Sequence, residues 1–296
     1  MINFPSLPSG EIPLWNGQSF QNNATVLFYS TNQTGWDDEL TALHEVEAGD
    51  GQHPIDILSR RNTLNALLSH GFPSNGTLLE IGCSSGFLLQ DLKAALPAAD
   101  IIGMDVVAVP LMALGKKLPN TPLLQMDILQ CTLAPQQFDA IIALNVLEHI
   151  ENDEAALSQI ARLLKPGGLL ILEVPQGPRL YDYFDAYLRH ARRYNKKDLL
   201  AKCQDAGFQT TQFSYLGILP YPAFFILKKI SRLRYGIRGE KCVNKEQKVR
   251  GQLKKTHNNS FLKAAFLVDR GLAKMKFLKG IRCFVVARAL SNERSK

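Results

Sequence analysis

The sequence contains few cysteines, and they follow no pattern. Five cysteines, an odd number, are scattered over 296 residues, and neither a Cys-x-x-Cys pair nor a cysteine and histidine cluster occurs. This argues against a disulfide framework and a structural zinc site, so we expect a reducing compartment. The first ten residues also lack a basic region followed by an apolar core, so no secretory signal is predicted. The expected location is the cytoplasm.

Long apolar runs are missing as well. The stretch 216–227 is largely apolar, but it is short and holds two prolines, so it is not expected to span a bilayer. Basic residues gather after it: residues 228–296 hold 20 Lys and Arg against 4 Asp and Glu. Apolar residues repeat at helical spacing over 261–275. Two interpretations stay open for 216–280: a lid packed on the core, which we favour, or peripheral contact with the inner membrane surface.

Short, continuous apolar runs alternate with helical patterns along the middle of the chain. Uninterrupted apolar character indicates strands buried on both faces, and their alternation with helices predicts a parallel sheet. The expected strands are 77–81, 101–105, 122–126, 138–144 and 169–174. The expected helices are 54–69, 87–95, 110–117, 153–164 and 196–206, and 165–168 is expected to be a turn. Residues 1–54 are interpreted as an N-terminal extension of loops and short elements.

Polar residues stand where these strands end. In sequence order they are Glu80, Asp105, Asp127 and Asn145, with Glu148 and His149 beyond the last. Ligands of an open parallel sheet bind beyond the carboxyl ends of the strands. Each residue alone could cap a helix, but the set predicts one ligand site.

The first of these strand ends is followed by small residues. Gly82, Ser84, Ser85 and Gly86 would let the backbone approach a ligand closely, and the next helix would begin there. The third glycine of a dinucleotide fingerprint and the Gly-Lys-Ser/Thr of a phosphate loop are both absent. Asp105, 23 residues after Gly82, is placed to accept hydrogen bonds from ribose hydroxyls.

Five ordered motifs resemble the class I S-adenosylmethionine-dependent methyltransferases, in particular the small-molecule group of types 11, 12 and 23. They are Leu-Leu-Glu-Ile-Gly-Cys-Ser-Ser-Gly-Phe (78–87), Gly-Met-Asp (103–105), Met-Asp-Ile (126–128), Phe-Asp-Ala-Ile-Ile-Ala-Leu-Asn-Val-Leu-Glu-His-Ile (138–150) and Leu-Leu-Lys-Pro-Gly-Gly-Leu-Leu-Ile-Leu-Glu-Val-Pro (163–175). The resemblance covers 55–217 and returns at 281–289. It implies an α/β fold: a doubly wound, mostly parallel, seven-stranded Rossmann-like sheet with a terminal antiparallel pair, 209–216 and 281–289. The core would be 55–217 plus 281–290, with 218–280 as a basic helical insertion.

The same resemblance implies roles in binding S-adenosyl-L-methionine. Glu80 would orient the turn and the methionine amine, Asp105 would hold the ribose, and Ser84 stands where the family commonly has glycine. A serine fits there if the position keeps an ordinary φ, and we expect the change to be tolerated. The other implied contacts are Gly82, Cys83, Ser84 and Gly86 around the methionine, Val106, Asp127 and Ile128 around the adenine, and Asn145 and Leu147 beside the methyl group.

The methyl acceptor is expected to be a small or lipid-like molecule. Candidates for a proton acceptor are His149, His190 and Glu148, although Glu148 and His149 could instead form a helix start that shapes the pocket floor. Arg193 and Tyr194 could bind a carboxylate or phosphate of the acceptor, or else lie in a solvated basic turn. No metal dependence is expected, and the oligomeric state stays open.

The sequence bears on two other function classes. A nucleic-acid methyltransferase of the amino-group type would carry Asn/Asp-Pro-Pro-Tyr/Phe after the fourth strand, where this chain has Asn-Val-Leu-Glu (145–148). No cysteine has the Pro-Cys or Thr-Cys context of a cytosine C5 enzyme, so a nucleic-acid partner is not expected. A protein that holds the cofactor without turnover stays open.

Overall fold

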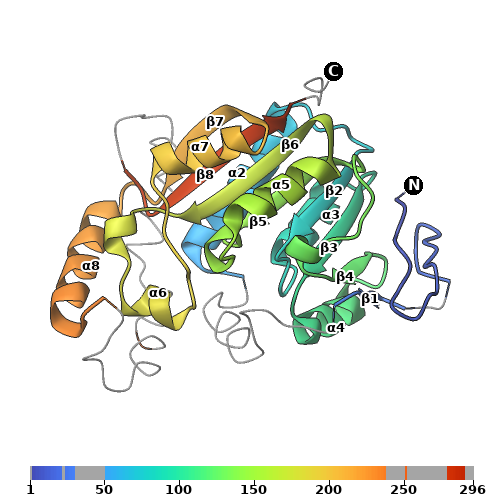
Figure 1. Cartoon of the computed structure of the whole chain (residues 1–296), viewed down its shortest axis with the longest axis horizontal. Helices are drawn as coiled ribbons and strands as arrows, with labels where there is room; N and C mark the ends of the chain where they lie inside the picture. The colour runs from blue at the N-terminus through green and yellow to red at the C-terminus, as the bar shows by residue number, and fades with distance from the viewer. Residues whose placement is uncertain (1, 22–23, 31–50, 238–250, 252–278, 291–296) are drawn as a thin grey trace.

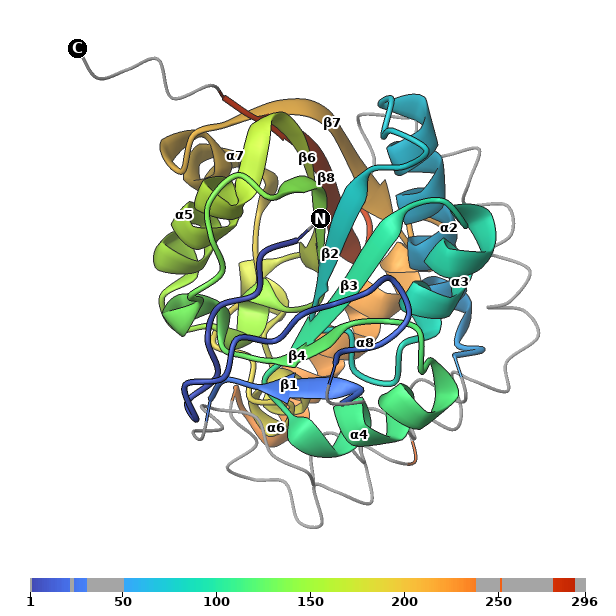
Figure 2. The same ribbon diagram turned by 90° about the vertical axis from the view of Figure 1, so that its right-hand side faces the viewer.

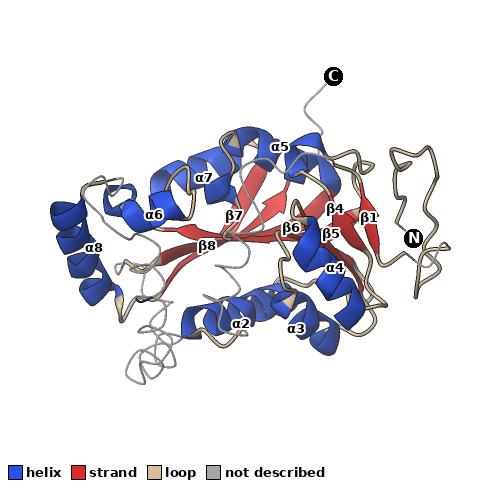
Figure 3. Cartoon of the chain, turned by 90° about the horizontal axis from the view of Figure 1, so that it is seen from below, coloured by secondary structure: helices blue, strands red, loops and turns tan. Residues whose placement is uncertain are grey.

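The computed structural model describes residues 2–21, 24–30, 51–237, 251 and 279–290 (Figure 1). Over these residues the chain forms one sheet with helices on both faces (Figure 3). The strands are β1 (Val26–Phe28), β2 (Thr77–Ile81), β3 (Asp100–Asp105), β4 (Leu123–Gln125), β5 (Phe138–Leu144), β6 (Leu164–Pro175), β7 (Phe208–Leu216) and β8 (Arg282–Ala289). The helices are α2 (Pro54–Ser69), α3 (Phe87–Ala95), α4 (Ala108–Lys117), α5 (Asp153–Leu163), α6 (Tyr183–Tyr187), α7 (Lys196–Asp205) and α8 (Tyr221–Tyr235), with the 3-10 turns η1 (Ile128–Gln130), η2 (Leu147–His149) and η3 (Pro178–Leu180).

The sheet has the predicted topology. Its strand order is β1-β4-β3-β2-β5-β6-β8-β7, with parallel pairing from β1 to β6 and antiparallel pairing of β8 with both neighbours. The chain winds outward from β2 through β3 to β4 and returns to β5 on the other side of β2. The switch point of strand order therefore lies between β2 and β5, where a ligand of a doubly wound sheet is expected.

The sheet has eight strands where seven were predicted. The additional strand is β1, which comes from the N-terminal extension and pairs in parallel with β4, Val26 opposite Leu123 (Figure 2). A strand of three residues is too short to show an apolar period in the sequence, and most of the residues around it are polar. The pairing itself, which is a long-range contact, makes this segment a strand.

Two apolar cores lie on the two faces of the sheet, which explains the uninterrupted apolar strands. On one face, buried residues of α2, α3 and α4 pack on the sheet, among them Leu58, Leu89 and Leu114. On the other face, α5 and α7 contribute residues such as Leu157 and Leu199. Because strand residues are buried from both sides, alternation with polar residues is not tolerated in the central strands.

The predicted turn at 165–168 is part of β6. Leu164 already pairs with Phe138, and the register shifts before Leu169 pairs with Ala140. Gly167 lies between them with φ of 76°. The Lys-Pro-Gly-Gly segment is therefore an irregularity inside the strand, as in a β-bulge.

The segments η3, α6 and α8 gather at one end of the sheet (Figure 1). α8 begins the predicted insertion, whereas the amphipathic pattern at 261–275 lies outside the described residues. Among the described residues, no helix is both long and apolar enough to cross a membrane.

Candidate functional site

The turn between β2 and α3 needs glycine at two positions. Gly82 has φ of 73°, and a Cβ there would lie 2.4 Å from Cγ2 of Val146. Gly86 has φ of 74°, and a Cβ would lie 2.3 Å from Cδ1 of Leu114. Left-handed φ and close packing both exclude larger residues, so the turn stays narrow and leaves its backbone accessible to a ligand.

Ser84 does not have the ordinary φ under which serine was expected to fit. Its φ is 42°, in the left-handed region that costs a non-glycine residue about 1–2 kcal/mol. The conformation is held by its backbone N–H, which donates to Oδ2 of Asp105 at 2.8 Å. The neighbouring Cys83 is buried, and burial raises the pKa of its thiol. The turn is thus fastened to the end of β3.

Asp105 organises the ends of β2 and β3. Its Oδ1 accepts from the N–H of Val107 at 3.0 Å, while Oδ2 accepts from Ser84. Burial raises the pKa of Asp105 despite these hydrogen bonds. The carbonyl of Val106 accepts a hydrogen bond from Gln125 at the end of β4, at 2.8 Å. The carboxylate is therefore fixed in position at the edge of the sheet.

Glu80 is a buried acid with an unsatisfied oxygen. Its side chain is 6% exposed, and Oε2 has no hydrogen-bond partner in the described part of the protein. Burial, and then the nearby charge of Asp105, raise its pKa well above the ordinary value. A carboxylate in this position is stabilised by a cation, so this side of the turn favours a positively charged ligand group.

The ends of β4 and β5 complete the edge. Asp127 caps η1, where its Oδ1 accepts from Leu129 N–H at 2.9 Å, and Ile128 is buried behind it. Asn145 has φ of 54°, and its Nδ2 donates to Oε1 of Glu173 at 3.3 Å. Leu147 follows in η2 and is buried. All predicted cofactor residues thus lie at the carboxyl edge of β2 to β5, and their individual roles stay predictions.

Glu148, His149 and His190 come together from distant parts of the sequence. Each offers one ligand atom, and these atoms lie within 4.8 Å of one another. The two imidazole rings meet edge to face, with centroids 4.7 Å apart. The backbone N–H of Ala191 donates to the carbonyl of Glu148 at 2.7 Å and joins the two segments. Two imidazoles and a carboxylate can move a proton or hold a divalent cation. The sequence did not reveal this second capability, and the expected absence of a metal stays a prediction.

The pKa values of two members of this group are shifted in opposite directions. Burial raises the pKa of Glu148 to about 8, and its Oε2 has no hydrogen-bond partner among the described residues. Burial lowers the pKa of His190, although Nδ1 is hydrogen bonded to Oδ1 of Asp185 at 3.0 Å. At neutral pH these pKa shifts leave the imidazole of His190 uncharged and the carboxyl of Glu148 protonated.

Arg193 and Tyr194 are buried, so they do not lie in a solvated turn. Arg193 donates from Nε to Oδ1 of Asp185 at 2.7 Å and from an η nitrogen to the carbonyl of Gln176 at 3.1 Å. The hydroxyl of Tyr194 donates to Oδ2 of Asp153 at 2.8 Å. These contacts fasten the segment to the core, and contact with an acceptor stays a prediction for both residues.

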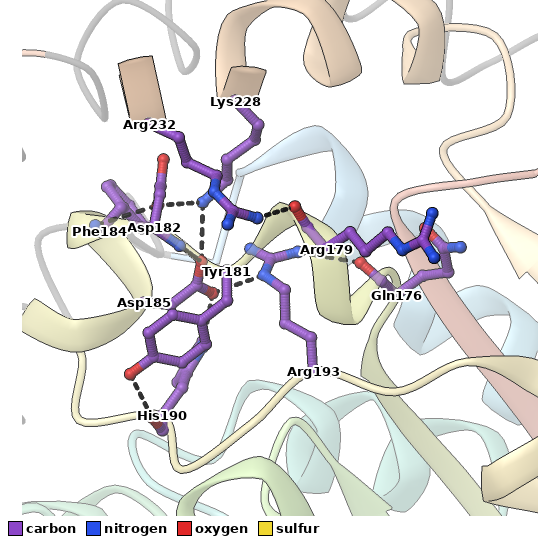
Figure 4. A network of polar contacts seen from close by, with 10 residues as sticks. All are labelled: Gln176, Arg179, Tyr181, Asp182, Phe184, Asp185, His190, Arg193, Lys228 and Arg232. Carbon is purple, nitrogen blue, oxygen red and sulfur yellow. Dashed lines mark hydrogen bonds and ion pairs between the residues drawn. The ribbon is translucent and has the colours of Figure 1, made fainter. Parts of the chain in front are cut away.

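Sequence reasoning missed the acid that holds this segment together. Asp185 accepts hydrogen bonds from His190, Arg193 and Lys228 (Figure 4). Burial alone would raise the pKa of Asp185, but the cations of Arg193 and Lys228 hold it well below the ordinary value. Its sequence context, an aromatic-rich segment outside the predicted helices, gave no signal.

Glu173 was missed as well. It is fully buried in β6, and its Oε1 accepts from Ser59 Oγ and from Arg282, each at 2.8 Å, while Oε2 has no hydrogen-bond partner in the described part of the chain. Burial raises its pKa. The presence of an acid inside the apolar run 169–174 was the signal that could have identified Glu173 as a functional candidate.

Comparisons with known proteins agree with this geometry. A family model described as a methyltransferase domain matches residues 56–212. The ubiquinone/menaquinone biosynthesis C-methyltransferase UbiE of Syntrophotalea carbinolica is 31% identical over 140 residues, 45% of this chain and 59% of that protein. The trans-aconitate 2-methyltransferase of Acidovorax ebreus is 32% identical over 142 residues, 47% of this chain and 50% of that protein. The chain thus spans about half the length of these relatives.

A solved structure shares the fold. Phosphoethanolamine N-methyltransferase 2 of Haemonchus contortus superposes with a TM-score of 0.54 at 17% identity, over 87% of this chain and 59% of that one. Because the family model covers more than half of the sequence and the sheet has the corresponding topology, the chain belongs to the methyltransferase domain family.

Proposed function

We propose that this protein is an S-adenosyl-L-methionine-dependent methyltransferase that acts on a small-molecule acceptor. The observation that carries the proposal is the buried, unsatisfied oxygen of Glu80 beside a turn that requires Gly82 and Gly86, at the switch point of the sheet. S-adenosylmethionine is a cation with an ammonium and a sulfonium group, so it supplies the positive charge that a buried carboxylate needs. A phosphate ligand would not do so.

The residues at the edge fit this cofactor. Glu80 would accept from its ammonium group and Asp105 from its ribose hydroxyls, while η1 would lie along the adenine. The full set in this proposal is Glu80, Gly82, Cys83, Ser84, Gly86, Asp105, Val106, Asp127, Ile128, Asn145 and Leu147. When bound, the cofactor supplies an electrophilic methyl group for in-line transfer.

The residues of the chain would then align the acceptor, exclude water and move a proton. His190 is the proposed proton acceptor, since burial keeps it neutral and its bond to Asp185 orients the ring. His149 lies against it and would contact the same acceptor. Glu148, with a pKa of about 8, would donate a hydrogen bond at neutral pH.

The acceptor is the less defined part of the proposal. One relative is named for ubiquinone and menaquinone biosynthesis and another for trans-aconitate, so both a lipid-like molecule and a small carboxylate are candidates. Arg193 and Tyr194 would favour an acidic group at the acceptor end of the site. We further propose a cytoplasmic location with peripheral membrane contact through 216–280.

The test has two measurements on the purified chain. Isothermal titration with S-adenosylhomocysteine should show binding, and binding should be lost in Ser84→Leu, which would fill the turn, but kept in the control Ser85→Ala. Formation of S-adenosylhomocysteine from S-adenosylmethionine with a metabolite extract should follow. Binding without product would favour a protein that holds the cofactor without turnover, and unchanged binding in Ser84→Leu would refute the assignment of the turn.

A further inference from the structure

Helix α8 buries a lysine and exposes several large apolar side chains, unlike an ordinary surface helix. Lys228, in the middle of the helix, is only 7% exposed. Ile226 is 57% exposed, Leu227 66% and Leu233 85%. A helix on the surface of a soluble domain normally buries its apolar stripe and exposes its lysines. The apolar face of α8 therefore points away from the part of the protein that the structure describes.

The inward face is fixed by buried ion pairs. Nζ of Lys228 lies 2.6 Å from Oδ1 of Asp182 and 2.9 Å from Oδ2 of Asp185 (Figure 4). It also lies 5.3 Å from the centre of the Phe184 ring and 5.7 Å from that of Phe224. A rotation of α8 that buried its apolar residues would pull Lys228 out and leave two buried acids with fewer partners, which is strongly unfavourable. The outward direction of the apolar face is thus built into the packing.

The outward face combines apolar and basic side chains. Ile226, Ile230 and Leu233 are exposed and follow one another at helical spacing. Lys229 and Arg234 are exposed beside them, and α8 contains no Asp or Glu. An apolar stripe flanked by cations is the pattern of a helix that lies in the plane of an anionic membrane surface.

The same charges argue against a second copy of the chain as the occupant. In a two-fold symmetric dimer each patch would face itself, so the cations of one α8 would meet those of the other with no acid of the helix to compensate. Like charges placed opposite each other disfavour such a contact. Phospholipid headgroups offer the opposite charge, and the acyl chains accept the apolar stripe.

We propose that α8 is a peripheral docking helix for an anionic bilayer. Phe225, Ile226, Ile230 and Leu233 enter the headgroup region, while Lys229 and Arg234 contact lipid phosphates. Through Lys228 and Asp185 the docked helix is joined to His190, so the candidate acceptor site is held next to the membrane surface. This inference assigns the membrane contact proposed above to α8, and it does not depend on methyl transfer.

The experiment is co-sedimentation of the purified full chain with vesicles. Vesicles of phosphatidylcholine mixed with an equal amount of phosphatidylglycerol should pellet the protein, and vesicles of phosphatidylcholine alone should pellet much less. The double variant Ile230→Ser/Leu233→Ser should bind the anionic vesicles at least about tenfold more weakly, because two exposed apolar side chains are removed from the contact. Lys229→Gln/Arg234→Gln should reduce the preference for anionic vesicles.

Val109→Ser/Met112→Ser is the matched control, because it removes two exposed apolar residues with the same spacing from α4. This control should bind as the wild type does, and the thermal unfolding of all variants should stay unchanged, since the altered side chains are exposed. Wild-type protein that stays in the supernatant would overturn the proposal. So would equal pelleting of the α8 variants, or a wild-type dimer that Ile230→Ser/Leu233→Ser dissociates, which would show that a second copy covers this face.

Discussion

Two residues at the candidate site sit in the left-handed backbone region, which serine avoids and asparagine tolerates. Ser84 and Asn145 have φ of 42° and 54°, and both flank the switch point of the sheet. The sequence identified both residues because strand ends can be read from apolar runs. It did not reveal their φ, because the conformation of Ser84 is held by Asp105, 21 residues further along the chain.

Replacement of Ser84 by glycine should stabilise the protein. Glycine adopts the left-handed region without the steric cost, so Ser84→Gly should raise the free energy of unfolding by about 1 kcal/mol. The control is Ser85→Gly, at an ordinary φ, which should lower it by about 0.5–1 kcal/mol. Chemical denaturation measures both, and a stabilised Ser85→Gly would contradict the argument.

The raised pKa of Glu148 makes stability depend on pH. A carboxyl with a pKa near 8 in the folded state and an ordinary pKa in the unfolded state keeps its proton up to a higher pH in the folded protein. The unfolded state thus binds fewer protons from about pH 5 to about pH 8, and the free energy of unfolding falls as pH rises through this window. Glu148→Gln, which cannot ionise, should flatten that fall in thermal unfolding measured across the window.

Glu80 and Glu173 also have raised pKa values. Part of the fall in the free energy of unfolding with rising pH should therefore remain in Glu148→Gln. An identical slope in the variant and the wild type would show that Glu148 does not titrate as described.

At the scale of elements, apolar periodicity predicted the helix 54–69 and the strands 77–81 and 138–144 with the observed bounds. It failed where a distant partner decides the structure. β1 is a strand because β4 is available beside it, and α6 is a five-residue helix capped by Asp182. Contacts of this kind leave no local pattern.

The N-terminal strand should contribute to stability as part of the core. Leu27 is fully buried and its neighbour Phe28 is exposed. Leu27→Ala should therefore lower the free energy of unfolding by about 2–5 kcal/mol, whereas Phe28→Ala should change it by less than about 1 kcal/mol. Urea denaturation distinguishes the two, and equal effects would mean that β1 is not held against β4.

The packing of α8 against the rest of the protein should depend on one lysine. Lys228→Ala leaves Asp182 without its buried cation and Asp185 with Arg193 alone, and it should cost about 3–5 kcal/mol of stability, while the neighbouring, exposed Lys229→Ala should cost little. The Lys228 charge also contributes to the lowered pKa of His190, after burial, so its removal should raise that pKa. NMR titration of the imidazole measures the shift, and Lys228→Arg should restore the wild-type value.

At the scale of the whole molecule, charge is divided between two parts of the chain. Residues 1–227 hold 14 basic and 23 acidic residues, whereas residues 228–296 hold 20 and 4. The sequence alone showed this division, but not that α8 exposes an apolar face. The fold class and the edge that carries the candidate site were also predictable, since both follow from strand periodicity. Asp185, Lys228 and Glu173 were not, because their partners are distant in sequence.

A ligand that binds only the folded molecule should stabilise all of it. S-adenosylhomocysteine at about 100 times its dissociation constant should add roughly 2.7 kcal/mol to the free energy of unfolding. Asp105→Asn should lose most of this gain, because it removes the proposed ribose acceptor. Thermal unfolding with and without the ligand tests this, and an equal gain in both proteins would place the ligand elsewhere.

The position of β8 has a consequence for biosynthesis. β8 follows β7 along the chain but lies between β6 and β7 in the sheet. While the ribosome is still making residues 218–281, the nascent protein carries two strand edges with nothing between them, and Glu173 has no guanidinium from Arg282. The sheet can close only when β8 inserts. We therefore expect a translating chain to need chaperones that shield strand edges until β8 has been made.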